Sequence, residues 1–437
     1  MNTYYIDLIN GDEYSDGMDI NNPRKDYKNI SLNAGDCILF KRGTFVREPL
    51  YSRGGAPHGP ITYGAYGEGK NPTFCGSIDV SDIENWIEIE PNLWECTHKL
   101  PSEVCNMVFN NGQMCGTLKW SKEELEAQGD FWDNRFGTSE QKLKYPKQRV
   151  IIYSERNPGE FYKHIECVIY GFRKMGMLAD NMIIEDIDFI NSGVHGLAGG
   201  GTNIHIKRCG FYFIGGCVWN KDLKIRFGNG VEFFNYAHDV SVDDCIFNDI
   251  YDSGVTHQGD SFCEVPTNVK FDNNMFIKCG MAAYEGRDYV PVDSTFNNNI
   301  CLDTGEGFSK LGEEMPRQSE IWPQPMGHHV FLWRMEEKSK NGRLEISGNI
   351  FGNAKYGATV YSIISKAAEE QIVFDNNTVC GTEYCVPIRF FGKNFNSFTE
   401  FSASTESDTN LYNSEIDIHE IKNKWLKDHN REAMYEF

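Results

Sequence analysis

A nine-residue pattern of alternating apolar and polar positions occurs seven times between residues 181 and 379. The copies are NMIIEDIDF from Asn181, NIHIKRCGF from Asn203, DVSVDDCIF from Asp239, NVKFDNNMF from Asn268, DSTFNNNIC from Asp293, RLEISGNIF from Arg343 and QIVFDNNTV from Gln371. The fourth position is apolar in every copy, and the ninth is Phe, Cys or Val. This two-residue period predicts that each copy is a β-strand with one buried face.

The seventh position of the pattern indicates how the copies are arranged. Asn274, Asn299, Asn349 and Asn377 occupy it in the last four copies, although Asn is unfavourable in the middle of a strand. If the copies stack on one another in register, the side-chain amides can form a hydrogen-bonded ladder along the stack. In two earlier copies Cys209 and Cys245 would fill the same column as small buried residues.

The spacing of the copies predicts a solenoid. Their first residues are separated by 22, 36, 29, 25, 50 and 28 residues, as expected for coils of about constant length with loops inserted on one side. The two-residue period excludes helical repeats, and no LxxLxL frame exists for leucine-rich repeats. We therefore expect an all-β fold: a single right-handed parallel β-helix with loop insertions and a C-terminal helix.

The rest of the chain divides around this repeat. Residues 1–100 contain short alternating segments closed by glycine and are predicted to be the N-terminal cap and first coils. Residues 101–176, which include a helical start at Ser121, are predicted to be an insertion packed on the stack. Residues 177–400 would form the core with the active-site groove. Residues 401–437 would form a tail whose amphipathic helix covers the last coil.

Composition limits the possible partners. The formal net charge of −21 argues against nucleic acid or an anionic membrane as a partner. The 14 cysteines show no paired spacing, which favours free thiols in a reducing cytoplasm over disulfides. Residues 1–20 lack the features of a secretory signal, so we expect a cytoplasmic protein, the alternative being a secreted one whose signal was removed. The oligomeric state is left open, and no cofactor or metal is predicted.

Several short motifs resemble a known group of proteins. Asn10-Gly11-Asp12, Gly35-Asp36 and Lys41-Arg42-Gly43 resemble the opening of many bacterial right-handed parallel β-helix proteins. GNGVEFF from Gly228 and YDSGVTHQG from Tyr251 resemble a subset associated with glycan utilisation. This superfamily includes pectate lyases, polygalacturonases, other glycoside hydrolases and lacto-N-biosidases. The polygalacturonase motifs do not occur in order. The resemblance implies a carbohydrate-active protein whose substrate is an oligosaccharide or polysaccharide.

A second set of strands, one after each copy, is expected to line the site. These segments are VHGLAG, VEFFN, VTHQGD, AAYEGRD, FSKLGEE, TVYSI and IRFFG. Their middle rows are unusually polar, and inserted loops would flank them to form a groove. The candidate catalytic residues are Glu232, Asp252, Asp260 and Glu285, and the candidate substrate-binding residues are His257, Gln258, Arg287, Lys310, Trp322 and Trp333. Each also has a purely structural interpretation, such as a turn former for Asp252 or a surface charge for Lys310.

Three functions compete for this groove. A glycoside hydrolase needs two carboxyl groups across the scissile bond, and the clustered carboxyls favour it, with Glu232 and Asp252 as the expected pair and Asp260 and Glu285 in reserve. A polysaccharide lyase would need a base and a cation that neutralises a uronate, roles open to His257, Arg287 and Lys310. A non-catalytic glycan-binding β-helix would need no clustered ionisable groups.

Overall fold

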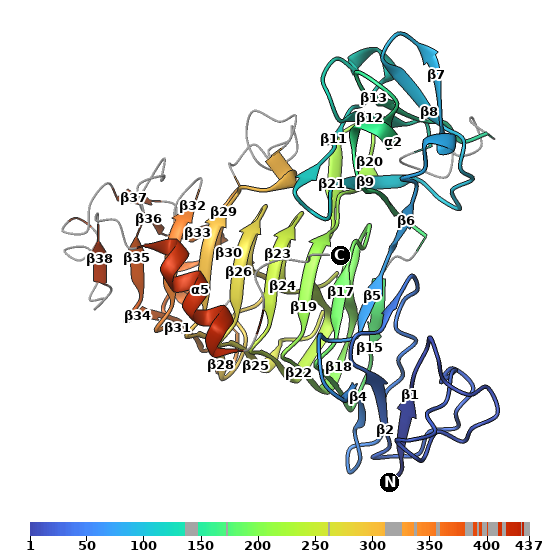
Figure 1. Cartoon of the computed structure of the whole chain (residues 1–437). Helices are drawn as coiled ribbons and strands as arrows, with labels where there is room; N and C mark the ends of the chain where they lie inside the picture. The colour runs from blue at the N-terminus through green and yellow to red at the C-terminus, as the bar shows by residue number, and fades with distance from the viewer. Residues whose placement is uncertain are drawn as a thin grey trace.

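The computed structural model describes residues 1–135, 147–171, 174–260, 263–310, 326–335, 339–354, 359–380, 388–390, 393–395, 400, 410–412, 417–429 and 431. These residues wind into successive coils whose strands pair in parallel with the coils before and after (Figure 1). The expected parallel β-helix is confirmed. Each nine-residue copy contributes two short strands with a bend between them, not the one strand that the alternation predicted.

The bend has a conformational cause. The sixth residue of every copy has a positive φ, from 52° at Arg208 to 70° at Gly348. Asn and Asp, which adopt this left-handed conformation at lower cost than most residues, hold the position in Asp186, Asp244, Asn273, Asn298 and Asn376. The chain therefore turns a corner once in each copy and passes from one face of the coil to the next.

Three faces surround the core. The face that carries the pocket described below, called the pocket face, is formed by β15 (Lys174–Leu178), the first parts of β18 (His195–Lys207) and β22 (Val231–Asp243), β24 (Ser253–Gln258), β27 (Ala282–Arg287), β30 (His328–Met335) and β33 (Thr359–Ile364). The second face is formed by β1 (Thr3–Ile6), β2 (Cys37–Lys41), β4 (Ile61–Tyr66), β16 (Met182–Glu185), the later parts of β18 and β22, β25 (Thr267–Asp272), β28 (Ser294–Asn297), β31 (Leu344–Ser347) and β34 (Ile372–Asp375). The third face is formed by β3 (Phe45–Val46), β5 (Thr73–Cys75), β17 (Asp188–Ile190), β19 (Gly210–Ile214), β23 (Ile246–Ile250), β26 (Met275–Cys279), β29 (Ile300–Thr304), β32 (Ile350–Ala354), β35 (Thr378–Cys380) and β38 (Asn410–Tyr412).

Two columns of side chains run through the interior along the stack. The ninth-position rings of Phe189, Phe211, Phe247 and Phe276 stack with centroids 4.7–5.5 Å apart. The seventh-position amides form the expected ladder, in which each Nδ2 donates to the next Oδ1 at 3.2, 3.1 and 2.9 Å between Asn274, Asn299, Asn349 and Asn377. Each of these oxygens also accepts a backbone N–H of the preceding coil. The ladder therefore fixes the register of neighbouring coils.

The unit inserted between the first coils and the repeat starts earlier than expected. Strands between Ser77 and Ile169 leave the stack and form two small sheets with a hydrophobic cluster of their own. One contains β6 (Ser77–Asp79), β9 (Val104–Phe109), β10 (Met114–Cys115) and β14 (Ile165–Ile169), and the other contains β7 (Trp86–Glu90), β8 (Leu93–Cys96), β11 (Thr117–Leu118), β12 (Asp130–Asp133) and β13 (Val150–Tyr153). Val80, Trp86 and Leu100 are buried in that cluster, so the boundary lies near residue 77 instead of 101.

The remaining elements are short, except for one helix. They are the hairpins β20 (Cys217–Asn220) with β21 (Ile225–Phe227) and β36 (Ile388–Phe390) with β37 (Lys393–Phe395), the 3-10 helices η1 (Ile83–Asn85), η2 (Lys122–Glu124) and η3 (Phe308–Lys310), and the helices α2 (Pro158–Phe161), α3 (Lys366–Glu369) and α5 (Ile418–Asp428). The expected helix near Ser121 is thus a single 3-10 turn. No helix within the described ranges is both long and apolar enough to cross a membrane.

The position of α5 corrects the expectation that it covers the last coil. The helix lies along the outside of the third face (Figure 1), where Trp425 and Leu426 pack with Tyr212, Ile246 and Met275. The outward side chains of this face are apolar, so leaving them in water would cost free energy. The apolar stripe of α5 covers part of that surface.

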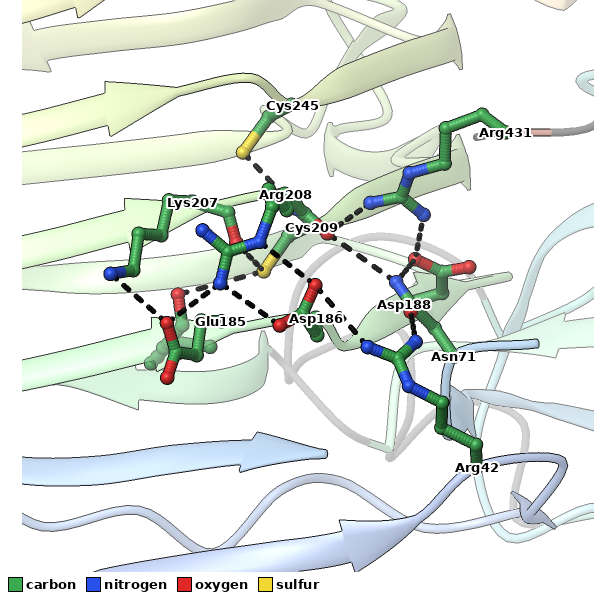
Figure 2. Close-up of polar contacts among 11 residues, drawn as sticks. Arg42, Asn71, Glu185, Asp186, Asp188, Lys207, Arg208, Cys209, Cys245 and Arg431 are labelled. Carbon is green, nitrogen blue, oxygen red and sulfur yellow. Dashed lines mark hydrogen bonds and ion pairs between the residues drawn. The ribbon is translucent and has the colours of Figure 1, made fainter. Parts of the chain in front are cut away.

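Polar contacts hold Arg431, three residues after the end of α5, against the early coils (Figure 2). Arg431 donates to Asp188 at 2.8 Å and to the carbonyl oxygen of Arg208. Arg208 in turn pairs with Asp186 at 2.9 Å. Burial alone would raise the pKa of Asp186, but the hydrogen bond from Arg208 and the charges of Arg208 and Arg42 hold that pKa below its usual value. The chain end is therefore tied to coils that precede it by more than 200 residues.

Replacing Asn299 by Leu should lower the free energy of unfolding by about 1–3 kcal/mol for each polar group left without a partner. The backbone N–H of Asn274 would lose its acceptor, its side-chain amide would keep only the Val242 carbonyl, and the carbonyl of Phe271 would lose the Asn299 donor. Urea unfolding followed by circular dichroism measures the change. Lys270→Leu, on an exposed neighbouring position, is the matched control and should change stability by no more than about 0.5 kcal/mol. Equal stabilities of the two variants would refute the structural role of the ladder.

Replacing Arg431 by Ala should lower the thermal midpoint, because Asp188 loses a charged hydrogen-bond partner worth about 1.5–3 kcal/mol. Lys424→Ala on the exposed side of α5 is the control, and should leave the midpoint almost unchanged. Differential scanning calorimetry gives both values. A midpoint unaffected by Arg431→Ala would show that α5 contributes no measurable stability through this contact.

Candidate active site

A cavity of about 440 Å³ opens on the outer side of the pocket face. Its floor is formed by β22, β24, β27 and β30, and one wall by the β20–β21 hairpin. The lining residues are His195, Trp219, Ile225, Phe227, Asn229, Glu232, Phe234, Asp252, Gln258, Met281, Glu285, Arg287, Met326, Phe331, Trp333 and Arg334. Three carboxyl groups and several aromatic rings therefore share one pocket.

Strand register explains why these side chains meet. Glu232 pairs with Thr256, Thr256 with Glu285, and Glu285 with Phe331, which makes one row across four coils. A second row, two residues further along each strand, contains Phe234, Gln258, Arg287 and Trp333. Residues of a row lie about 4.8 Å apart along the stack and point to the same side of the sheet. The rows place Glu232 and Glu285 on the floor, two strands apart.

Glu232 is held by amide side chains. Its Oε2 accepts a hydrogen bond from Asn229 Nδ2 at 2.7 Å and another from Gln258 Nε2. The Nδ1 atom of His195 lies 3.6 Å from the same oxygen and accepts the backbone N–H of Asn229 at 3.2 Å. This acceptor role corresponds to an unprotonated Nδ1, so the Glu232–His195 contact would become an ion pair only after His195 is protonated.

Glu285 has partners on both of its oxygens. Oε1 accepts from the indole Nε1 of Trp333 at 2.8 Å and from Arg287 Nη2 at 3.2 Å, and Oε2 accepts from Ser253 Oγ at 3.4 Å. The guanidinium of Arg287 also lies over the Trp333 ring, 4.3 Å from its centroid. Glu285 is only 1% exposed, against 8% for Glu232. Glu285 therefore fixes the position of the Trp333 ring and is less accessible to a ligand than Glu232.

Asp252 enters the pocket from the turn before β24. Its Oδ2 accepts the backbone N–H of Gly228 at 2.9 Å, and its own N–H donates to the Gly228 carbonyl at 3.0 Å. Gly228 has a φ of 144°, and a Cβ there would lie 2.2 Å from the carbonyl oxygen of Val194, so only glycine fits. These contacts place Asp252 beside the coil that carries Glu232.

Most of the candidate residues meet in the pocket, and some do not. Glu232, Asp252, Glu285, Gln258, Arg287 and Trp333 line it. Asp260 is exposed and lies outside the lining, just past the end of β24, where its backbone N–H donates to Asn235. Trp322 and the side chain of Lys310 lie outside the described residues.

His257 does not contact the pocket, contrary to expectation. Alternation along β24 directs Thr256 and Gln258 to the opposite side of the sheet from His257, whose ring is buried inside the β-helix. Its Nε2 lies 2.8 Å from the hydroxyl of Tyr284. The in-register residue on the next coil is Gly286, where a Cβ would come within 3.1 Å of His257 Nε2. An inward side chain cannot bind a substrate on the outer surface.

Two of the expected lining strands are also wrong. FSKLGEE does not form a strand of the pocket face: Phe308–Lys310 is the 3-10 helix η3, after a turn in which Gly305 and Gly307 have φ values of 90° and 83°. The strand that continues the rows is β30, which begins at His328 and supplies Phe331 and Trp333. IRFFG contributes β36, which lies against β33 but hydrogen-bonds with β37 in a separate two-stranded sheet.

The sequence did not single out several residues of the pocket. His195 begins β18, and the register that pairs Leu197 with Val231 places it beside Asn229. The alignment of the second set of strands, which identified Glu232, could also have identified His195 and Asn229. Trp219 and Phe227 come from the β20–β21 hairpin, and sequence alone gives no register between this hairpin and the coils.

His328 and His329 are adjacent at the start of β30. His329 is buried, its Nδ1 contacts Thr304 Oγ1 at 2.7 Å, and its ring stacks on Phe351. In the part of the chain that the structure describes, no three His, Cys, Asp or Glu side chains are arranged to hold a metal ion.

Burial lowers the pKa of His257 to about 3, whereas in the unfolded chain it titrates near 6.5. Between these values the unfolded chain binds a proton that the folded chain does not, so acidification destabilises the fold. His257→Gln should reduce the loss of stability between about pH 6 and 4 by roughly 1.4 kcal/mol per pH unit. It should leave activity at the pocket unchanged, since the ring faces the core.

Urea unfolding at a series of pH values measures this dependence. His58→Gln, at an exposed position, is the matched control and should keep the pH dependence of the wild-type protein. Identical pH slopes for wild type and His257→Gln would mean that His257 is protonated within the folded protein.

Comparison with known proteins gives the fold. No protein-family model matches the chain, and no curated protein matches it. Among solved structures, the complex of XylC with xylose aligns over 88% of this chain with a TM-score of 0.52 and 13% identity. Pectate lyase Pel9A aligns over 90% of this chain and 72% of its own, with a TM-score of 0.50 and 11% identity. The chain spans 63% of the length of XylC. At these identities the likeness shows that the chain shares their parallel β-helix fold.

Proposed function

We propose that this protein is a glycoside hydrolase that binds a sugar in the pocket and uses Glu232 and Asp252 as its catalytic pair. The observation that carries this proposal is the convergence of three carboxyl groups on one pocket with aromatic walls. Glycosidases act through two carboxyl groups placed on either side of the scissile bond. Flat apolar rings beside polar groups suit sugars, which present both C–H faces and hydroxyl edges.

Glu232 is suited to act as base or nucleophile. Asn229 and Gln258 donate to its Oε2, and these contacts fix the orientation of the carboxylate before a substrate arrives. A positioned carboxylate is what the attack on a sugar ring, or the activation of a water molecule, requires. In this proposal the other carboxylate oxygen, Oε1, is the atom that attacks the sugar or activates the water molecule.

Asp252 is suited to act as the general acid. It reaches the same pocket from the neighbouring coil, where it is hydrogen-bonded to Gly228, and in this proposal the glycosidic bond lies between its side chain and that of Glu232. Glu285 then serves as a positioning residue, because its oxygens already accept from Trp333, Arg287 and Ser253. This assignment keeps the pair expected from sequence and moves Glu285 out of the catalytic role.

The fold shared with XylC and pectate lyase Pel9A supports a carbohydrate substrate, since XylC was solved in complex with xylose. A polysaccharide lyase is the second candidate, favoured by Arg287, a cation in the pocket that could neutralise a uronate. Arg287 is already paired with Glu285 at 3.2 Å, and the pocket holds more carboxyl groups than the lyase reaction needs. Hydrolysis is therefore preferred. A non-catalytic glycan-binding role would leave the carboxyl groups without a function.

Glu232→Gln and Asp252→Asn should each lower the rate by at least about a hundredfold while the protein stays folded, because each removes an ionisable group and preserves size. The release of reducing ends from a panel of neutral and uronic glycans measures the rate. Glu285→Gln should raise KM more than it lowers kcat, since it loosens Trp333. Asp260→Asn is the matched control outside the pocket and should keep full activity.

The products distinguish the candidates. A hydrolase gives saturated sugars, and nuclear magnetic resonance of the first product shows whether the anomeric configuration is retained or inverted. Ultraviolet absorbance from an unsaturated uronate would assign the protein to the lyases. Full activity in all the carboxyl variants would place the reaction elsewhere in the molecule.

A further inference from the structure

Two large aromatic side chains lie at the pocket with much of their surface in water. Trp219 is 58% exposed and Phe234 is 40% exposed, and both line the cavity. Phe331 and Trp333, at 2% and 4% exposed, are buried, and Phe227 is partly buried. Exposed aromatic surface next to a polar pocket is typical of a place where a ligand binds. The proposed catalytic mechanism gives no role to Trp219 or Phe234.

The two rings come from different elements, both of which are rigidly held. Phe234 lies on β22, one outward position beyond Glu232. Trp219 lies on the β20–β21 hairpin, next to Val218, which is buried in the core of the inserted unit. Arg226 of the same hairpin donates to the carbonyls of Gly216 at 2.7 Å and Cys105 at 2.9 Å. The backbone that carries each ring is thus held in place before a ligand binds, which lowers the entropic cost of binding.

The charges of the pocket limit what the rings can bind. The cations Arg287 and Arg334 pair with Glu285 and Asp288, at 3.2 and 2.5 Å. Glu232, the proposed base or nucleophile, adds a negative charge that these cations do not offset, whereas Asp252 as the proposed general acid adds none. An anionic unit such as a uronate would be repelled. The amide of Gln258 and the guanidinium of Arg334 offer hydrogen-bond donors for hydroxyl groups at the edge of a ring.

We infer that Trp219 and Phe234 form a second sugar-binding subsite, which holds a neutral sugar unit adjacent to the unit that is cleaved. The substrate is then an oligosaccharide of at least two neutral units. This inference rests on the proposed function and extends it to the class of substrate. The C–H faces of the ring pack on the aromatic surfaces, and its hydroxyl groups reach the polar edge of the pocket.

The test uses the full chain carrying Glu232→Gln, which should bind substrate without turning it over, on an array of immobilised neutral and uronic glycans. We expect the retained glycans to be neutral and to contain two or more units. Adding Trp219→Ala or Phe234→Ala should weaken binding of these glycans by about two- to tenfold in titration calorimetry. Binding of the corresponding monosaccharide should change little, because it occupies only the catalytic subsite.

Two further variants control for misfolding and for aromatic surface in general. Trp219→Phe keeps a ring and should retain most of the affinity. Tyr236→Ala removes a residue that is 44% exposed on the same strand, beyond the bend at Asn235 and outside the pocket lining, and should have no effect. Unchanged affinity in both alanine variants, retention of uronic glycans, or retention of no glycan would overturn the subsite. Hydrolysis that persists in Glu232→Gln would overturn the proposed function, whereas the binding measurements would still test the subsite on their own.

Discussion

The stacking of successive coils in fixed register is the constraint on which this structure depends. The asparagine column joins the last four copies of the repeat with side-chain and backbone hydrogen bonds inside the core, where an unpaired amide is costly. Side chains alternate between the two sides of a strand, so a slip of one residue would exchange the inside and the outside. On the pocket face such a slip would bury Glu232 and expose His257. The same interaction that stabilises the solenoid therefore assembles the site.

Sequence predicted the parts of the structure that follow from a local period. The ladder column and the grouping of Glu232 and Glu285 on one sheet both derive from the nine-residue pattern and the strand that follows it. The corner at the sixth position was not predicted, because alternation alone does not show where a strand bends. His257 was misplaced for a related reason, since three polar residues in succession were read as one polar row although their directions alternate.

Other features depend on contacts between segments far apart in the sequence, which a local pattern does not show. The replacement of FSKLGEE by β30 follows from the glycine turn at Gly305 and Gly307, which directs the chain away from the sheet. The wall that bears Trp219 depends on how a hairpin packs against the inserted unit. The apolar stripe of α5 was recognised correctly, yet its partner surface could not be chosen without knowing which face of the stack is apolar on its outside. Local pattern thus determined the floor of the pocket and tertiary packing determined its walls.

The packing of α5, a late element of the chain, on earlier coils has a consequence for how the chain folds during synthesis. In an ordinary solenoid each coil contacts its neighbours only, so coils can fold in the order in which they leave the ribosome. Here the third face keeps Tyr212, Ile246 and Met275 uncovered until Trp425 and Leu426 of α5 have emerged. The coils that carry the pocket are therefore complete while an apolar surface beside them is still open to water. During that interval the nascent protein exposes apolar surface to which chaperones or other unfinished chains can bind. The docking of α5 then covers this surface.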